Sequence, residues 1–531
     1  MEIQAAPRQA YTMATFQQPF QCIQLVQKKN SNSKNVLVAS AGAKLYSYVA
    51  DSGQSLSVWP QDGADTSNAN NAGSNPDIEG PPEKKRKVEP SSEQDVKNSA
   101  PAAKKAPAWT NIPILTATPD GEYLVALTGE DKCIRVFQIE EDGSFLQLSE
   151  RHMPKRPCAI TFMENNDILT GDKFGDVYSM PLIPSAEPRI PKSASQPRST
   201  RIAATNLTVH TQRNLKSLQM QEEQKKKALE AEKNKNKDND KEDQKPIFEH
   251  DLLLGHVSLL TDVAFTSLPS PDPSSSKRTY ILSADRDEHI RVSRGPPQAH
   301  IIENHCFGHT AFISKLCVPE WAPTLLVSGG GDPHLLVWNW LDGQLLHTVP
   351  LLEQTSEAAA EGEAKEIAVR GIWASPSSSS DSDSDTQRLI LVALEGNPTL
   401  YPFTLNADGT MTRQTPLLAN GNILDIQITP SNTILISIDT IHSPGSTSEW
   451  RSGPASPAKF IEAFSFKPTE KGEWEAVEDG LVSAVDRLGT ESVVVDGGAE
   501  KKVKNALSNG LYGLENLRKK TWDDPEAANV M

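Results

Sequence analysis

The chain has 531 residues and a formal net charge of −16 at pH 7, and it combines 38 prolines with an aromatic fraction of only 6%. This length allows about three domains, but the many prolines and few aromatic residues indicate that much of the chain lies outside a packed core. The acidic balance argues against strong independent binding to nucleic acid, and we find neither a signal peptide nor an apolar run long enough to span a bilayer.

Cysteine usage points to the compartment. The five cysteines form neither a Cys-x-x-Cys pair nor a zinc-binding spacing: Cys22, Cys133, Cys158, Cys306 and Cys317. An odd and scattered set is typical of reduced thiols in a cytosolic or nuclear protein. We therefore expect a soluble, intracellular protein without a metal site and without contact to a membrane.

The first predicted elements are a strand near Phe16–Val26 and a hairpin over Val36–Tyr48. Residues 51–108 follow as a stretch rich in Asn, Ser, Pro and Lys, which we expect to be disordered. This linker contains a basic cluster between prolines, made of Lys84, Lys85, Arg86 and Lys87. Such a cluster predicts a nuclear localisation signal and hence a nuclear protein, with a solvated basic loop as the alternative.

Two turn-and-strand patterns come next, over Leu127–Phe137 and Leu169–Tyr178. Their turn aspartates, Asp131 and Asp172, lie 41 residues apart. The following insertion, residues 184–246, is polar and basic: between positions 181 and 245 it holds 14 Lys and Arg against 9 Asp and Glu. We expect this insertion to be a disordered loop or a mobile arm.

The strongest pattern consists of two Gly-His pairs, at His256 and His309, each followed by an aspartate-centred turn and a strand. The turn aspartates Asp287 and Asp332 lie 45 residues apart, close to the period of about 40–45 residues of a WD blade. In such a blade the imidazole bonds a strand hydroxyl and the turn carboxylate, and Trp338 would end the second strand. We predict a structural role for His256, Asp287, His309, Asp332 and Trp338, because buried polar networks need all their partners.

Further degenerate copies cover Leu389–Phe403 and Ile434–Asp439, and Val36–Tyr48 is a third, which brings the count to seven. The predicted fold class is all-β: a single seven-bladed WD-repeat β-propeller with long disordered insertions. We expect the strand near Phe16–Val26 to complete the last blade, because closing the ring removes exposed strand edges. The predicted organisation is residues 1–50 for the first strands and blade 1, 51–108 for the linker, 109–183 for blades 2 and 3, 184–246 for the basic insertion, 247–350 for blades 4 and 5, 351–467 for blades 6 and 7 with an acidic Ser/Asp loop, and 468–531 for a charged tail.

The run Leu253–Val263, the string Ser283–Ser293 and the run Phe307–Ser314 together resemble the WD-repeat, non-catalytic subunit of the eukaryotic tRNA (guanine-N7)-methyltransferase. The specific part is Asp-Arg-Asp-Glu-His-Ile-Arg-Val-Ser, where a generic WD repeat would end in Trp-Asp. The resemblance is sharp over about 90 residues and loose over the other blades. Long low-complexity insertions are typical of a filamentous-fungal member.

The resemblance implies a regulatory subunit that binds a separate methyltransferase subunit, stabilises it, and so supports N7-methylation of a guanosine in the tRNA variable loop. S-adenosylmethionine would be held by that partner, and tRNA would be bound through the complex. The resemblance also implies that Arg291 faces the catalytic subunit, with Arg286 and His289 flanking it. The alternative for Arg291 is an exposed strand residue that pairs with Glu288 or with solvent.

Two other classes of function stay open at this point. Fold alone does not exclude a nuclear WD-repeat adaptor or a scaffold for chromatin or a ubiquitin ligase. An enzyme that uses Asp285 and Asp287 as a carboxylate pair is disfavoured, because two aspartates in one turn are ordinary turn chemistry. The glycine runs, at 329–331 and 497–498, do not open a helix after a parallel strand as a cofactor-binding loop would, so we predict no catalytic residues and no cofactor.

The end of the chain carries one more candidate element. Leu511, Leu514 and Leu517 have the spacing of a short amphipathic helix within residues 511–522. Such a helix would pack on the ring or on the partner, and the cations at 518–520 could reach tRNA phosphates. A frayed tail is the alternative.

Overall fold

The computed structural model describes residues 14–27, 35–61, 107–185, 248–270, 277–351, 366–375, 388–451, 459–467, 473–495 and 500–519. The predicted nuclear signal at 84–87, most of the linker, most of the basic insertion and the acidic loop lie outside these residues. Within the described residues, no helix is both long and apolar enough to cross a membrane.

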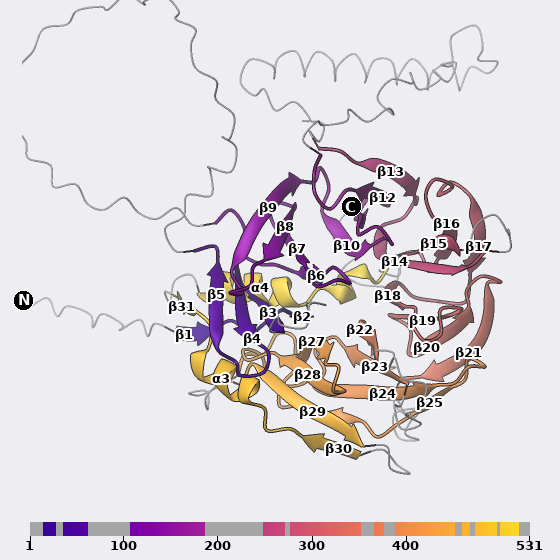
Figure 1. Ribbon diagram of the computed structural model, residues 1–531. Coiled ribbons are helices and arrows are strands. Elements are labelled where there is room, and N and C mark those ends of the chain that lie inside the picture. Colours follow the sequence, from indigo (N-terminus) through magenta and orange to yellow (C-terminus); the bar gives the residue numbers. More distant parts are fainter. Residues whose placement is uncertain are drawn as a thin grey trace, which may run out of the picture.

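Seven antiparallel sheets surround a common centre like the blades of a propeller (Figure 1). Blade 1 consists of β2 (Cys22–Val26), β3 (Val36–Ala41), β4 (Lys44–Val49) and β5 (Ser55–Trp59), and blade 2 of β6 (Ile114–Ala117), β7 (Tyr123–Thr128), β8 (Cys133–Ile139) and β9 (Phe145–His152). Blade 3 consists of β10 (Pro157–Phe162), β11 (Ile168–Asp172), β12 (Asp176–Met180) and β13 (Asp251–Gly255), and blade 4 of β14 (Leu260–Pro269), β15 (Lys277–Asp285), β16 (Ile290–Arg294) and β17 (Ile302–Cys306).

The remaining three blades complete the ring. Blade 5 consists of β18 (Ile313–Cys317), β19 (Leu325–Gly330), β20 (His334–Asn339) and β21 (Gln344–Pro350). Blade 6 consists of β22 (Val369–Ala374), β23 (Leu389–Leu394), β24 (Thr399–Leu405) and β25 (Met411–Arg413), with β26 (Leu417–Leu418) also paired to β24. Blade 7 consists of β27 (Ile423–Ile428), β28 (Thr433–Ile438), β29 (Ile461–Lys467) and β30 (Glu473–Ala476). The prediction of an all-β, seven-bladed propeller is therefore confirmed.

The strands form where they do because both faces of each blade are covered by its neighbours. The second strand of a blade is accordingly a continuous apolar run: all six residues of β23 are buried. By contrast, the outermost strand β21 is largely exposed. The core consists of clusters between adjacent blades, such as Val327 and Val337 of blade 5 against Ile390 and Val392 of blade 6.

The prediction for ring closure is wrong. Each blade is continuous in the sequence, and the strand expected to complete the last blade is instead the innermost strand of blade 1. The strand β1 (Ala14–Gln17), which precedes β2, lies outside blade 1 and pairs antiparallel with β31 (Ser492–Val495). Blade 7 needs no strand from the N-terminus because β30 supplies its fourth strand.

Residues 473–495 and 500–519, which belong to the predicted charged tail, are structured. After β30 come helix α3 (Gly480–Leu488), β31, helix α4 (Glu500–Leu511) and the 3-10 helix η2 (Leu514–Leu517). The apolar face of α3 packs through Leu481 and Val485 on Phe20 and Ile23 of blade 1 and on Phe460 of blade 7. The C-terminal elements thus join the first and last blades. Blade 1, in turn, extends beyond the predicted boundary at residue 50, because β5 ends at Trp59.

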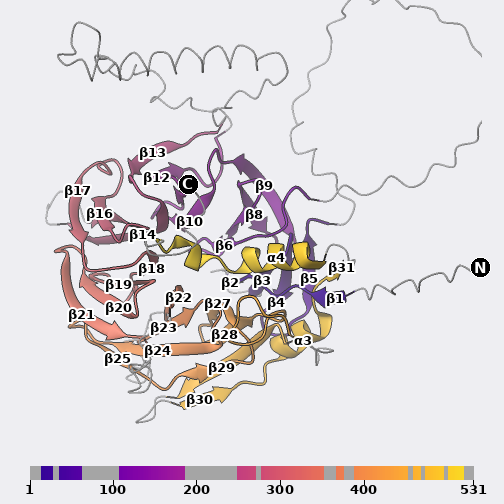
Figure 2. The ribbon, with the colours of Figure 1, turned by 180° about the vertical axis from the view of Figure 1, so that it is seen from behind.

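Residues 500–519 cross the centre of one face of the ring, as seen from behind in Figure 2. We call this segment the strap. The predicted helix over 511–522 is replaced by the end of α4 and by η2, so the three leucines lie on two different elements.

Candidate partner-binding face

One end of every blade carries two kinds of connection. Because neighbouring strands are antiparallel, the turn between the second and third strands lies at the same end as the connection from the fourth strand to the next blade. We call this end the top face. Its blade 4 portion contains the turn Arg286–His289 and the connections that carry His256 and His309.

In blade 5 the structure brings three of the predicted network residues, His309, Asp332 and Trp338, together around one strand hydroxyl. His309 lies between Asp332, at 2.6 Å from Nδ1 to Oδ2, and Ser328, at 2.7 Å from Nε2 to Oγ. The indole N–H of Trp338 donates to the same hydroxyl at 2.8 Å. Burial alone would raise the pKa of Asp332, but the hydrogen bonds from His309 and Thr310 hold it below its usual value.

Blade 4 has the same relay with a different aspartate. His256 lies 3.1 Å from Asp285 and 2.7 Å from the Ser283 hydroxyl. The prediction that Asp287 accepts from the histidine is therefore wrong: its own N–H donates to Asp285, and its side chain is 45% exposed. Asp285 occupies the relay because β15 ends there, which aims its carboxylate inward. Asp285 and Asp287 consequently do not form a free carboxylate pair.

A serine stands at the strand end of blade 4 where blade 5 has Trp338. Ser293 is fully buried, and its hydroxyl accepts from Nε of Arg291 at 2.9 Å. Nη1 of Arg291 donates to the carbonyl of Gly255 at 3.2 Å. The departure from the Trp-Asp ending thus gives the arginine a hydroxyl partner on its own strand.

Arg291 has no carboxylate partner among the described residues. The alternative pairing with Glu288 does not occur, because the Glu288 carboxylate contacts Nζ of Lys519 at 2.8 Å. Burial lowers the pKa of the Arg291 guanidinium, although such a group remains protonated. Arg291 is therefore a half-buried cation whose hydrogen bonds go only to neutral oxygens.

A cluster of aromatic side chains starts at the strand neighbour of this cation. His305 pairs with Arg291 across β16 and β17, and its ring stacks on Phe307 with centroids 5.3 Å apart. His289 meets the same phenyl ring edge-on at 5.5 Å. Phe307 is 63% exposed, and Val257, two residues after the Gly255 carbonyl that Arg291 contacts, is fully exposed. We call Val257, His289, Arg291, His305 and Phe307 the partner surface.

Arg286, the third predicted partner residue, is already engaged within the chain. Its Nε donates to the carbonyl of Leu517 in the strap at 2.8 Å. Of the three predicted residues, the structure thus places Arg291 and His289 on one exposed surface and Arg286 beneath the end of the strap.

A third relay was missed by the sequence analysis. In blade 7, Nδ1 of His442 lies 2.6 Å from Asp439, and its Nε2 lies 2.8 Å from the hydroxyl of Ser508 in α4. Tyr512 donates its hydroxyl to the same aspartate. The Asp-x-x-His spacing was a weak signal, but the serine comes from 66 residues further along the chain.

One cluster has the composition of a metal site: Asp131, Cys133 and His152 bring one ligand atom each within 4.8 Å of one another. The carboxylate of Asp131 is held by Nη2 of Arg135 at 2.8 Å. Burial also raises the pKa of Cys133 to about 12, so the thiol is a poor ligand at neutral pH. The Arg135 guanidinium lies where a metal ion would have to bind Asp131, so the two side chains form an ion pair instead.

Comparisons with known proteins agree with this architecture. Residues 37–464 match the model of the tRNA methyltransferase TRM82 WD40 domain. A tRNA (guanine-N(7)-)-methyltransferase non-catalytic subunit trm82 from Aspergillus oryzae is 48% identical over 96% of this chain and 99% of its own length. The protein of the same name from Aspergillus clavatus is 47% identical over 97% of this chain and its full length, and that from Coccidioides immitis is 41% identical over 92% of this chain and 95% of its own. The chain therefore belongs to the Trm82 family, the WD40 non-catalytic subunits of tRNA (guanine-N7)-methyltransferase.

Proposed function

We propose that this chain binds the catalytic subunit of a tRNA (guanine-N7)-methyltransferase in a heterodimer, through the partner surface, and stabilises its active conformation. The observation that carries the proposal is Arg291, a half-buried cation without an anion among the described residues. Its strand neighbour His305 stacks on the exposed ring of Phe307. Interfaces commonly combine such an arginine with aromatic anchors. A carboxylate of the partner would complete the pair.

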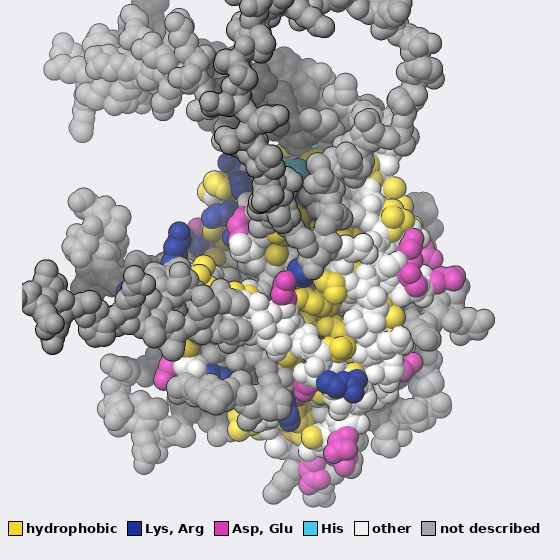
Figure 3. Space-filling view, turned by 90° about the vertical axis from the view of Figure 1, so that its left-hand side faces the viewer, with side chains coloured by type: hydrophobic (Ala, Val, Ile, Leu, Met, Phe, Trp, Pro, Cys, Tyr) yellow, Lys and Arg dark blue, Asp and Glu magenta, His cyan; other side chains and the backbone are white. Residues whose placement is uncertain are grey.

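In this complex the catalytic subunit holds S-adenosylmethionine, and N7-methylation of the tRNA variable-loop guanosine takes place there. Contact with tRNA comes through the complex. The net charge of −16 does not oppose such contact, because charge acts locally and Lys and Arg side chains gather at the upper left of the side view in Figure 3. The purified chain alone should transfer no methyl group to tRNA, and activity should require the catalytic subunit.

The proposal is tested by reversing the charge of Arg291. Arg291→Glu removes the pair and places a like charge at the interface, which costs about 2–5 kcal/mol or more, a loss of affinity of roughly thirtyfold or greater. Titrating the catalytic subunit against wild type and variant by calorimetry measures this loss. The variant should still fold, with a melting temperature only a few degrees lower, because it loses the hydrogen bonds of Arg291 to Ser293 and Gly255, about 1 kcal/mol each.

Two further variants make the test specific. Arg291→Lys should recover part of the affinity, since a point charge replaces the planar guanidinium. Arg388→Glu reverses the charge of an exposed cation of blade 6, which lies over the ring of Trp321 from blade 5. This variant should bind the catalytic subunit like wild type. If Arg291→Glu binds as tightly as wild type, the partner surface lies elsewhere.

We also propose that the basic cluster Lys84, Lys85, Arg86 and Lys87 directs the chain to the nucleus. The support is the sequence: four cations in a row between prolines. Replacing all four by Ala should move a fluorescent fusion toward the cytoplasm while the melting temperature stays constant. An unchanged nuclear signal would show that import depends on the partner or on another basic segment.

A further inference from the structure

The strap contacts five of the seven blades in succession. Its first anchors lie on blades 1 and 7: the amide of Gln21 donates to the carbonyl of Gly510 at 2.8 Å, and His442 holds the Ser508 hydroxyl. Tyr512 is 7% exposed and receives a hydrogen bond from Asn422 at 3.1 Å besides donating to Asp439. The α4 end of the strap is therefore fixed by buried polar groups.

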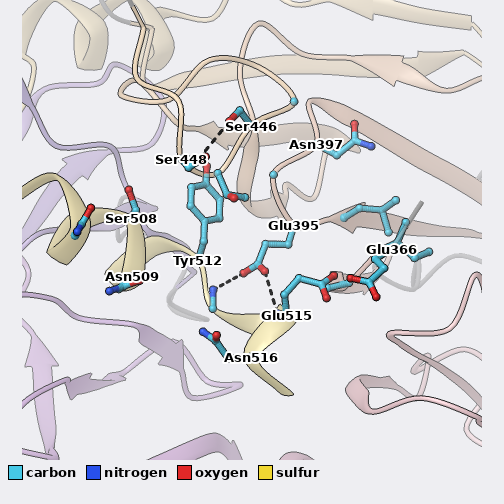
Figure 4. Close-up of a pocket in the computed structure, with 18 of the residues that line it drawn as sticks. Glu366, Glu395, Asn397, Ser446, Ser448, Ser508, Asn509, Tyr512, Glu515 and Asn516 are labelled. Carbon is cyan, nitrogen blue, oxygen red and sulfur yellow. Dashed lines mark hydrogen bonds between the residues drawn. The ribbon is translucent and has the colours of Figure 1, made fainter. Parts of the chain in front are cut away.

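Blade 6 holds the middle of the strap. Nη1 of Arg370 donates to the carbonyl of Leu511 at 2.8 Å. The carboxylate of Glu395 accepts the N–H groups of Gly513 at 2.7 Å and Leu514 at 3.1 Å, at the start of η2. In Figure 4 the Glu395 side chain points toward the strap between Tyr512 and Glu515. The first N–H groups of a helix have no acceptor within the helix, and here a carboxylate accepts them. The connection between α4 and η2 thus has a specific receptor on the ring.

The last residues of the strap reach blades 5 and 4. Arg518 donates to the carbonyls of Gly331 at 3.3 Å and Ile367 at 2.9 Å. The carbonyl of Leu517 accepts from Arg286, and Nζ of Lys519 lies 3.2 Å from Asp287 and 2.8 Å from Glu288. Three consecutive residues of the β15–β16 turn are therefore tied to the end of the strap.

That turn borders the partner surface directly. Glu288 has a positive φ of 72°, which is unfavourable for a residue other than glycine and needs support from its surroundings. His289 follows Glu288, contacts the Phe307 ring edge-on, and is separated from Arg291 by one residue. Holding the turn in this conformation therefore fixes where His289 stands relative to Arg291.

We propose that the end of the strap, Leu517 to Lys519, positions the β15–β16 turn for binding of the catalytic subunit. The inference rests on the function proposed above and extends it to residues that do not themselves have to touch the partner. Docking of the strap orders the turn before the partner arrives, so less conformational freedom is lost on binding. Leu517 and Lys519 are accordingly positioning residues, with Arg286 as the receiving group.

Two truncated chains form a matched test. A chain that ends at Tyr512 keeps α4 and the buried anchors of the strap but lacks η2 and Lys519. A chain that ends at Lys519 keeps every described contact and serves as the control. Lys519→Glu, which faces Asp287 and Glu288 with a like charge, provides a second variant, with the exposed Lys502→Glu of α4 as its control.

Two measurements are made on each chain. Hydrogen exchange of residues 286–289 in the chain alone reports the order of the turn, and we expect it to be about tenfold faster in the chain that ends at Tyr512. Calorimetric titration with the catalytic subunit should show affinity about three- to tenfold weaker, with Lys519→Glu changing in the same direction. Both control chains should match the full chain in both measurements.

The outcomes separate the two proposals. Unchanged exchange overturns the positioning role, and so does faster exchange with unchanged affinity. Weaker affinity with unchanged exchange also overturns it, because the strap would then contact the partner directly. If the unaltered chain binds no catalytic subunit at all, the proposed function fails, whatever the exchange of the turn shows.

Discussion

Asp332 ties more groups of its blade together than any other residue of the predicted network. Its carboxylate accepts from His309 and from the backbone N–H of Thr310, and His309 in turn fixes the Ser328 hydroxyl that receives the Trp338 indole. Asp332→Ala leaves His309 and Thr310 without this partner in a buried site. We expect a loss of about 3 kcal/mol in the free energy of unfolding, measured by denaturant or thermal unfolding.

The matched control is Asp287→Ala in the neighbouring blade. Its side chain is 45% exposed and, within the described part of the chain, forms an ion pair with Lys519 alone at 3.2 Å, so its removal should change the stability by less than about 0.5 kcal/mol. Equal losses for the two variants would contradict the distinction between the buried relay and the exposed turn.

The relay residues show what sequence spacing can and cannot resolve. The Gly-His pairs marked His256 and His309 because each pair is followed by an aspartate-centred turn and a strand. The string Asp285-Arg286-Asp287 offers two carboxylates, and only the end of β15 decides that the first faces inward. The relay of His442 left only the weak Asp-x-x-His signal in the sequence, because its hydroxyl comes from Ser508 on a distant helix.

At the scale of elements, strands with a continuous apolar run were predictable. The weaker patterns over Leu127–Phe137, Leu169–Tyr178 and Leu389–Phe403 each proved to be the second and third strands of one blade. The strap was not predictable in this way, since its contacts are mostly hydrogen bonds. Arg370 and Glu395 form hydrogen bonds with its backbone, and the hydrophobic periodicity of a sequence does not indicate such bonds.

The ring as a whole closes by contacts between complete blades. The hydroxyl of Ser437 in blade 7 donates to the carbonyl of Phe20, and Thr490 after α3 donates to the carbonyl of Gln18 at 2.8 Å. The pairing of β1 with β31 lies outside both blades. The expected exchange of a strand between the first and last blades is one physical solution to closure, and no local pattern distinguishes it from this clasp of N- and C-terminal segments.

Asp425 lies at this junction, where its carboxylate accepts the N–H of Ile23 from blade 1 at 2.9 Å. Burial raises the pKa of Asp425 to about 6. The folded state therefore holds this proton more tightly than the unfolded chain does. The resulting stability is fully present below about pH 4 and is lost as the pH rises through about 6.

Asp425→Asn should remove this pH dependence, because the amide stays neutral and keeps an oxygen for the N–H of Ile23. We expect the melting temperatures of variant and wild type to agree near pH 4.5, and the variant to melt a few degrees higher at pH 8. Thermal scans across this range measure the difference. Asp251→Asn, at an exposed position of β13, is the control and should follow wild type throughout. A constant offset between Asp425→Asn and wild type at every pH would mean that the junction does not titrate, and closure would then depend on the clasp of α3 and β31 instead.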